Sequence, residues 1–323
     1  MISVVIVTYK RGWALPFSLH SLVNQTYPPD EVVVVLKPSS DGSEEVIKKF
    51  SRDLNINLII QKKGNVTDAY SLGIDEAQGD IIMFLDDDAI SEKHWIQKYL
   101  NLFRMLPNAG GISGITYKAF VNKSGQVFKT NQEFCKHKAT VKGLHRREPL
   151  PIFKEYDEFI SISSFPVRLP SFASIIKSAL PYGANMAFRR SAVAKSGLSK
   201  AYSESKIGCL FETYLALCAI LRGYTVYRVT DPTIGPVVWH ICHSSSLQRT
   251  PLRSEFWRSY DLAYNYWRLK YLGLKTSLMR CLLGLIITSR KNLNIRLPAY
   301  IYGFLKGAFY YKTTIKNTNI SER

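Results

Sequence analysis

The sequence predicts an α/β fold: a Rossmann-like, doubly wound and mostly parallel sheet, followed by a helical, basic region. Short β-branched runs alternate with segments of helical apolar spacing over residues 1–90, and right-handed crossovers stack such βαβ units into a doubly wound sheet. The last 78 residues differ, because they are helical in pattern and carry 14 Lys and Arg against 3 Asp and Glu. We therefore expect a sheet domain over residues 1–245 and a helical region over residues 246–323.

Simple signals predict the first strands and the helices between them. Nearly continuous β-branched runs are typical of strands buried on both faces of a parallel sheet. The strands are predicted over residues 2–8, 31–36, 58–61 and 81–85, and the helices over residues 13–24, 41–50 and 65–77. Prolines after the first helix and Gly79 after the third end those helices.

Regular structure is expected to lapse and then resume. Residues 115–180 are rich in Ser, Lys and Pro, and we expect them to pass over the active face of the sheet as an irregular excursion. A regular segment follows at residues 183–191. A helix is predicted over residues 212–221, and a strand over residues 224–229.

Composition narrows the class of protein. The chain has 323 residues, 46% apolar and 12% aromatic, which suffices for a large core and excludes a disordered tail protein. The cysteines are far apart and odd in number, which argues against a disulfide framework or zinc knuckle and favours a reducing cytoplasm; they are Cys135, Cys209, Cys218, Cys242 and Cys281. The N-terminus lacks the features of a signal peptide, and no apolar run reaches the roughly 18 to 20 residues that span a bilayer. We expect a cytoplasmic protein.

Acidic residues gather where one buried strand ends. Ligands bind a doubly wound sheet at the carboxyl ends of its strands, which makes residues 8–11, 37–41 and 86–88 neighbours. Three consecutive carboxylates, Asp86 to Asp88, are costly to place together unless a cation arrives. Carboxylates are ligands that Mg²⁺ and Mn²⁺ prefer, so the sequence predicts a divalent cation site. The alternative is a solvated acidic turn that caps a helix starting at Ser91.

A series of ordered motifs resembles a known family. They are residues 3–11 (SVVIVTYKR), 25–35 (QTYPPDEVVVV), 64–73, 77–88 (AQGDIIMFLDDD), 183–190 (GANMAFRR) and the segment from Phe211-Glu212 to Gly223-Tyr224. Together they resemble a family 2 glycosyltransferase of the GT-A fold over roughly residues 1–240.

This resemblance implies an inverting transfer of a sugar from a nucleotide-sugar donor to an acceptor hydroxyl. Asp86 and Asp88 would hold Mg²⁺ or Mn²⁺, which neutralises the diphosphate leaving group. A carboxylate must take the proton of the acceptor hydroxyl, and Glu212 is the predicted base because it lies at the family's spacing in this segment. Asn185 and Met186 lie in the segment that resembles the acceptor side. The alternative for Glu212 is a structural carboxylate at a helix N-terminus.

Further residues are predicted around the donor. Thr8, Tyr9 and Arg11 follow the first strand, whose end faces the nucleotide in this fold. Asp68, Asp86 and Asp87 are further predicted donor contacts.

Two departures from the family pattern leave the donor open. Leu36-Lys37-Pro38-Ser39 stands where the family commonly has Asp-Asp-Gly-Ser, so the carboxylate that recognises the nucleobase is missing. Asp41 is the candidate that replaces it from further along the loop. Ala69-Tyr70-Ser71 stands in place of the family's Ala-Arg-Asn. An inactive member that keeps only the fold is therefore an open alternative.

A histidine is predicted to complete the metal site. His240 stands where relatives often place a histidine that binds the metal or the diphosphate, and its neutral imidazole is a suitable ligand. His243 competes for the same role, and a structural role is the alternative for both.

The basic C-terminal region is predicted to lie on a membrane surface. The apolar segments 278–288 and 297–311 are too short to span a bilayer, and Lys and Arg border them. Aromatic rings at headgroup depth and cations against anionic lipid suit an interfacial segment. We therefore expect peripheral attachment to the cytoplasmic face and a lipid-linked or other glycan acceptor. The alternatives are helices that pack on their own domain, and nucleic-acid binding, which no recognised motif supports and which we do not expect.

Overall fold

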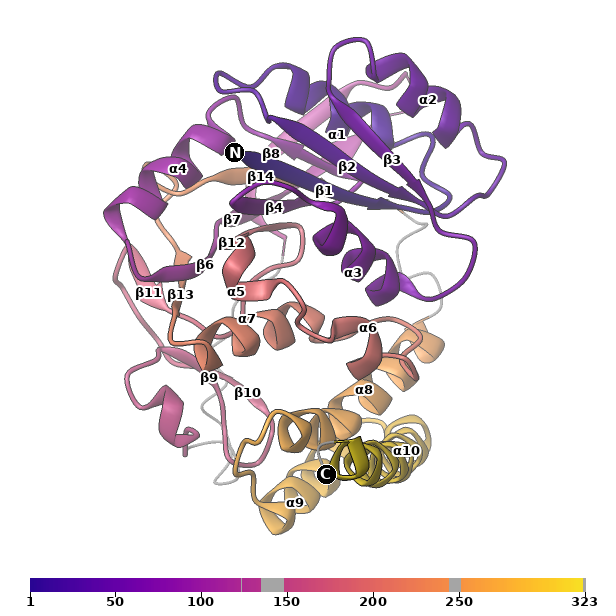
Figure 1. The fold of residues 1–323 in the computed structure, drawn as a ribbon, viewed down its shortest axis with the longest axis vertical. Helices are drawn as coiled ribbons and strands as arrows, with labels where there is room; N and C mark the ends of the chain where they lie inside the picture. Colours follow the sequence, from indigo (N-terminus) through magenta and orange to yellow (C-terminus); the bar gives the residue numbers. More distant parts are fainter. Residues whose placement is uncertain (123, 135–147, 244–250, 322–323) are drawn as a thin grey trace. The chain divides into compact units, whose positions relative to one another are not determined.

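The computed structural model describes residues 1–122, 124–134, 148–243 and 251–321, and the chain forms two compact units (Figure 1). Unit 1 comprises Met1–His137, Ser171–Ser203 and Phe211–His243. Unit 2 comprises Lys138–Pro170, Glu204–Leu210 and Ser244–Arg323. The boundary predicted at residues 245–246 and the thiol of Cys135 both lie outside the described residues.

The first half of unit 1 is the predicted parallel sheet. Its four strands are β1 (Ile2–Thr8), β2 (Glu31–Leu36), β3 (Ile56–Ile60) and β4 (Ile81–Leu85). β1 pairs in parallel with both β2 and β4, and β2 pairs in parallel with β3. The doubly wound, mostly parallel sheet is confirmed. Of its four strands only β3 has bounds that differ from those predicted, because it begins two residues earlier and ends one residue earlier.

Four further strands extend this sheet to eight, in the order β11-β13-β6-β12-β4-β1-β2-β3. They are β6 (Ala109–Ser113), β11 (Ile175–Lys177), β12 (Asn185–Arg189) and β13 (Thr225–Val229). β12 runs antiparallel between β4 and β6, whereas β13 is parallel to β6. The segment that begins at Gly183 therefore lies directly beside the strand that carries the three carboxylates.

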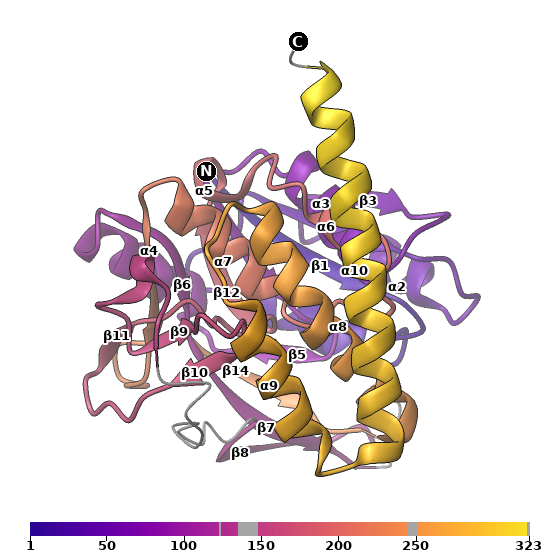
Figure 2. The same cartoon turned by 90° about the horizontal axis from the view of Figure 1, so that it is seen from below.

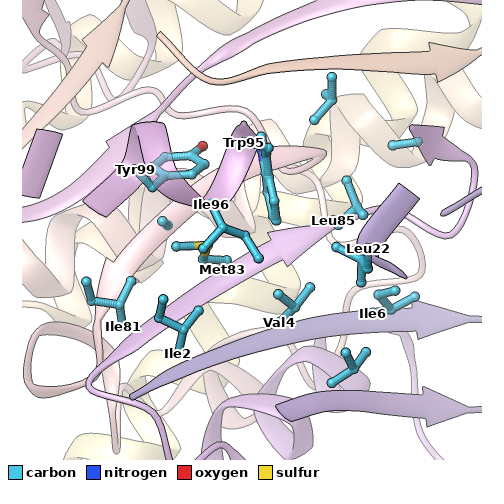
Figure 3. Packing of buried hydrophobic residues seen from close by; sticks show 14 of the residues in the cluster. Ile2, Val4, Ile6, Leu22, Ile81, Met83, Leu85, Trp95, Ile96 and Tyr99 are labelled. Carbon is cyan, nitrogen blue, oxygen red and sulfur yellow. The ribbon is translucent and has the colours of Figure 1, made fainter. Parts of the chain in front are cut away.

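Helices cover both faces of the sheet. Alternate residues of a strand point to opposite faces, and Ile2, Val4 and Ile6 of β1 contribute to one core (Figure 3). That core also contains apolar side chains of α1 (Leu15–Val23), α2 (Ser43–Phe50) and α4 (Trp95–Met105). α3 (Val66–Glu76) lies on the other face, where a Cβ on Gly73 would lie 2.5 Å from Val5 Cγ1. Only glycine permits this close approach.

A second, four-stranded sheet has the order β5-β14-β7-β8. Its strands are β5 (Ala89–Ser91), β7 (Ile115–Val121), β8 (Val127–Glu133) and β14 (Val237–Ile241). Two expectations were wrong here. Residues 115–133 form a β-hairpin rather than an irregular excursion, and the acidic turn leads into strand β5, since helix α4 begins only at Trp95.

Three helices complete unit 1. α5 (Arg190–Val193) and α6 (Leu198–Ala201) are short, and α7 (Phe211–Leu221) is the helix predicted over residues 212–221. Glu212 lies in the first turn of α7.

Unit 2 is built around three helices, α8 (Pro251–Tyr271), α9 (Leu278–Ser289) and α10 (Leu293–Ser321), and a hairpin of β9 (Glu158–Ile160) and β10 (Pro166–Arg168). α10 runs along α8, as Figure 2 shows. Gly303 and Gly307 allow this contact, because a Cβ on either would lie within 2.5 Å of Tyr260 or Trp267. A core cluster joins Phe165 to all three helices.

A buried ion pair fastens a loop to α8. The carboxylate of Asp261 is fully buried and receives hydrogen bonds from Arg268 at 2.8 Å, from the Ser205 hydroxyl at 2.7 Å and from the Cys209 backbone N–H at 3.0 Å. The charge is thus paired and saturated, as a buried carboxylate requires.

The described cysteines, Cys209, Cys218, Cys242 and Cys281, are free thiols. In the parts of the chain that the structure describes, no helix combines the length and the apolar character needed to cross a bilayer.

Candidate functional site

The three consecutive carboxylates lie at the carboxyl end of β4. Asp87 and Asp88 are buried and Asp86 is partly exposed. The turn is fixed by two backbone hydrogen bonds, from the Ala89 N–H to the Asp86 carbonyl and from the Ile241 N–H to the Asp88 carbonyl. The second bond brings the end of β14 to the carboxylates.

His240 on β14 completes a compact group of ligands. Its Nε2 lies 3.1 Å from Asp88 Oδ1 and 3.4 Å from Asp86 Oδ2, and its ring stacks on Phe134. One ligand atom from each of Asp86, Asp88 and His240 lies within 4.8 Å of the other two. Two carboxylates and an imidazole suit a divalent cation such as Mg²⁺ or Mn²⁺, so the residues fit the predicted metal.

Cationic groups surround these carboxylates. Arg11 Nε lies 3.7 Å from carboxylate oxygens of both Asp87 and Asp88, and His243 Nε2 lies 2.8 Å from Asp88 Oδ2. Trp13 packs edge-on against the His243 ring. The structure therefore gives the two histidines different places, with His240 between Asp86 and Asp88 and His243 on Asp88 alone.

The charges in this cluster shift each other's pKa. Burial raises the pKa of Asp87 well above its usual value, and the neighbouring Asp88 raises it further. Burial acts the same way on Asp88, but the hydrogen bond from His243 and the charges of His240 and Arg11 lower its pKa overall. Burial opposes protonation of His240, but Asp86 and Asp88 outweigh it and raise its pKa to about 9. The cluster is thus a strong attractor for positive charge.

Tyr70 connects the carboxylates to α7. Its hydroxyl donates to Asp86 Oδ1 at 3.2 Å, and its ring stacks on Phe211, the residue before Glu212, with the centroids 4.4 Å apart. Sequence reasoning did not place Tyr70 in the site. The available signal was its position in the segment where the family usually has Ala-Arg-Asn.

Glu212 is a carboxyl group with an altered pKa near the cluster. Burial raises its pKa to about 8, and the charge of Asp86 contributes to the increase. Gly183 lies against it, because a Cβ at position 183 would lie 2.7 Å from Glu212 Oε1. The segment that starts at Gly183 and the base segment thus meet at this carboxyl group.

Asn185 and Met186, predicted as acceptor contacts, have internal side chains. Both are fully buried, and the Asn185 amide forms four hydrogen bonds inside unit 1. Its Oδ1 accepts from Trp95 Nε1 and the Tyr99 hydroxyl at 2.8 Å, and its Nδ2 donates to the carbonyls of Ile115 and Pro236 at 2.9 Å. Both side chains are thus internal, and their contact with an acceptor stays a prediction.

The predicted donor residues of the first strand differ in exposure. Thr8 is buried beside Asp87, whereas Tyr9 is 48% exposed. The ammonium groups of Lys10 and Lys37 lie over the Tyr9 ring, 5.2 and 5.7 Å from its centroid. The ring thus stands beside positive charge at the edge of the sheet.

The carboxylates of Asp41 and Asp68 accept hydrogen bonds from their own loops and from segments distant in sequence. Asp41 accepts from the Gly12 N–H at 2.7 Å and from the hydroxyls of Ser39 and Ser43. Asp68 accepts from the Asn65 N–H in a capping box at the start of α3 and from the Ser199 hydroxyl. Both carboxylates order the loops around the carboxyl edge of the sheet.

Comparison with known sequences places the chain in a family. The profile of glycosyl transferase family 2 matches residues 3–195, more than half of the chain. The chain is 29% identical to glycosyltransferase AglE of Haloferax volcanii over 139 residues, which are 38% of this chain and 45% of that protein. It is 27% identical to glucosyl-dolichyl phosphate glucuronosyltransferase of the same organism over 134 residues, 39% of this chain and 42% of that protein. These matches thus span less than half the length of either relative.

Solved structures share the fold. GalNAc-T7 with UDP, GalNAc and Mn²⁺ matches 83% of this chain and 47% of its own, with a TM-score of 0.57 at 15% identity. TarS 1-349 of S. aureus in complex with UDP-GlcNAc matches 82% of this chain and 66% of its own, with a TM-score of 0.51 at 16% identity. With the profile match, these likenesses show that the chain has the GT-A fold and belongs to glycosyl transferase family 2.

Proposed function

We propose that this enzyme transfers a sugar, with inversion, from a nucleotide-sugar donor to a hydroxyl of a glycan acceptor, and that it requires a divalent cation. One observation carries the proposal: the ligand group of Asp86, Asp88 and His240 is joined by Tyr70 to the helix that presents Glu212. A site for the leaving group and a base for the acceptor are thus parts of one constellation.

Asp86, Asp88 and His240 would hold Mg²⁺ or Mn²⁺. The bound cation supplies positive charge that offsets the charge developing on a departing nucleoside diphosphate. The chain's own contribution is the fixed turn after β4 and the hydrogen bond to β14, which keep the three ligands together. Arg11 adds a guanidinium beside Asp87 and Asp88, where it can pair with donor phosphate.

Glu212 acts as the general base. A base is most effective when its pKa lies near the working pH, and burial raises the pKa of Glu212 to about 8. Gly183 leaves room for its carboxyl group, and Tyr70 fixes the start of its helix through Phe211.

The donor occupies the carboxyl edge of the sheet near β1 and β4. Thr8, Tyr9, Arg11 and Asp87 contact it, and the exposed Tyr9 ring offers a stacking surface for the nucleobase. Asp41 and Asp68 hold the loops that border this pocket. A nucleotide-sugar donor is supported by two structural neighbours, because TarS 1-349 was solved with UDP-GlcNAc and GalNAc-T7 with UDP.

The acceptor is a lipid-linked glycan at the cytoplasmic face of a membrane, in the synthesis of a polysaccharide or of a glycan for protein glycosylation. The relative named glucosyl-dolichyl phosphate glucuronosyltransferase supports a lipid-linked acceptor.

The proposal is tested by screening nucleotide sugars for turnover with Mn²⁺, Mg²⁺ or a chelator. Turnover is expected only with a divalent cation. Glu212→Gln should lower transfer by about 10² to 10⁴-fold, because the base is lost, while donor binding measured by thermal shift stays near that of the wild type. Glu76→Gln, an exposed glutamate at the end of α3, is the matched control and should keep full activity.

Two results would contradict this function. Full transfer by Glu212→Gln would remove the base assignment. Absence of both binding and turnover with every nucleotide sugar would instead favour a non-catalytic member of the fold.

A further inference from the structure

The helices α9 and α10 turn apolar side chains outward. On α9, Met279, Leu282, Leu283, Ile286 and Ile287 recur at helical spacing and are all exposed. On α10, Leu293, Leu297, Ile301, Leu305 and Phe309 recur every four residues and are also exposed. Met279 is 77% exposed, Leu305 63% and Phe309 70%. We call these ten residues the outer apolar face.

This face is not needed for the core of unit 2. α9 contributes Cys281 and Leu285 to the core cluster, and α10 contributes Tyr300. Gly303 and Gly307 of α10 lie against α8. Each helix therefore packs inward through one side and leaves a second apolar side in water. Exposed apolar side chains on this scale mark an interaction site.

The charges around the outer apolar face have one sign. Residues 275–313 contain seven Lys and Arg and no Asp or Glu. Arg280, Arg296 and Lys306 pair with glutamates from other parts of unit 2. The remaining four, Lys275, Arg290, Lys291 and Lys312, have no ion-pair partner among residues 1–122, 124–134, 148–243 and 251–321.

We propose that the outer apolar face binds the surface of an anionic lipid bilayer, with α9 and α10 lying in the interface rather than crossing it. Apolar side chains enter the acyl boundary, and the unpaired lysines and arginines meet anionic headgroups. This binding does not depend on the catalytic assignment. It rests on the proposed function only for the acceptor: it names the surface that would bring the enzyme to a lipid-linked glycan.

Charge favours a bilayer over a second copy of the chain. A two-fold symmetric dimer through this face would place the same cationic segment of both protomers together. Like charges in an interface oppose association, whereas an anionic membrane supplies the complementary charge.

The test uses the full chain and vesicles of phosphatidylcholine with or without phosphatidylglycerol. Cosedimentation is expected with the phosphatidylglycerol vesicles, and added salt should weaken it. Ile286→Asp and Leu305→Asp should each weaken binding by about tenfold, because a charge replaces an inserted apolar side chain. Lys291→Gln should weaken it by about fivefold. Met105→Asp, at an exposed apolar residue of α4 in unit 1, is the matched control and should bind like the wild type.

Thermal unfolding measured without vesicles shows that each variant is folded, and turnover of nucleotide sugars, measured separately, separates this proposal from the enzymatic one. The proposal is overturned if the wild type does not cosediment, or if Ile286→Asp and Met105→Asp bind equally well. It is also overturned if the wild type is a dimer in solution that Ile286→Asp dissociates, since the face would then belong to a second copy.

Discussion

Unit 1 and unit 2 each contain a region that is energetically unfavourable for an isolated protein in water. In unit 1 the cause is concentrated charge, and in unit 2 it is exposed apolar surface. At the end of β4, unit 1 gathers three carboxylates, two of them buried. On α9 and α10, unit 2 exposes the apolar side chains of the outer apolar face. The first region concentrates carboxylates on one turn, and the second lacks an apolar neighbour. The difference indicates that the two regions serve partners of different chemistry.

An ordinary surface helix shows that neither feature is required by the fold. On α2, the exposed side chains are those of Glu44, Glu45, Lys48 and Lys49, while Ile47 enters the core. α9 has the same inward pattern but an apolar outer side. The exposed apolar residues of unit 2 are therefore additional to what packing needs.

The largest expected effect is a loss of turnover when one carboxylate of the unit 1 cluster is removed, which should leave the membrane-binding region of unit 2 unaffected. Asp88→Ala removes a metal ligand and should lower metal-dependent turnover by about a thousandfold, since several kcal/mol of charge stabilisation depend on the cation. Vesicle binding should not change. The measurement is initial rate against Mn²⁺ concentration, beside cosedimentation.

Asp80→Ala is the control for this variant. Asp80 precedes the same strand at its other end, is exposed, and its carboxylate pairs with the N-terminal amine. Equal losses in Asp80→Ala and Asp88→Ala would mean that the strand, rather than the ligand, is affected.

The second effect is a pH dependence of folding stability that arises in unit 1, at Glu212, and not in the outer apolar face of unit 2. Glu212 has a folded pKa of about 8, above its ordinary value of 4.5, so the folded state keeps a proton that the unfolded state releases. Stability therefore falls as pH rises through this window, by an amount on the order of 1–3 kcal/mol. Glu212→Gln should remove this loss and be more stable than the wild type near pH 8, as urea denaturation would show.

Glu76→Gln serves as the reference in the same titration, and its stability should follow that of the wild type. Identical pH profiles for Glu212→Gln and the wild type would show that Glu212 is not held in its neutral form. Residues 275–313, which include the outer apolar face, contain no Asp or Glu. Vesicle binding by the wild type should therefore be nearly constant over this pH range.

The smallest effect tests the fit around Glu212. Gly183→Ala adds a methyl group 2.7 Å from Glu212 Oε1 and must displace the carboxyl group. We expect transfer to fall by about tenfold with donor binding retained, because misplacement of a catalytic group by a fraction of an ångström lowers rate. Gly125→Ala changes an exposed turn with open space around it, so steady-state rates should be unaffected.

The strands of the first sheet were predictable because continuous β-branched runs admit few alternatives. β1, β2 and β4 have the predicted bounds. The hairpin of β7 and β8 was missed, since its outer strand is polar and exposed and carries little alternation. The hairpin is held in a sheet by the pairing of β7 with β14, which lies more than 100 residues away in sequence.

The candidate site was predictable where a residue type has few other uses. Three consecutive carboxylates after a buried strand indicated the cluster, and His240 was found through the resemblance. The sequence could not distinguish an exposed polar residue from one whose hydrogen bonds are internal, so the burial of Asn185 was not foreseen. The roles of Asp41 and Asp68 as loop caps depend on partners that only the fold brings together.

Asn185 also determines which residues must be included when this metal site is grafted onto another protein scaffold. One amide fastens a strand of the large sheet to the Ile115 and Pro236 carbonyls, which flank the smaller sheet that holds His240. An aspartate there lacks both donors, and a glutamine is longer by one methylene. A graft of Asp86, Asp88 and His240 alone would leave the histidine without its alignment, so the minimal transferable part includes Asn185 and the Trp95 and Tyr99 side chains that orient it.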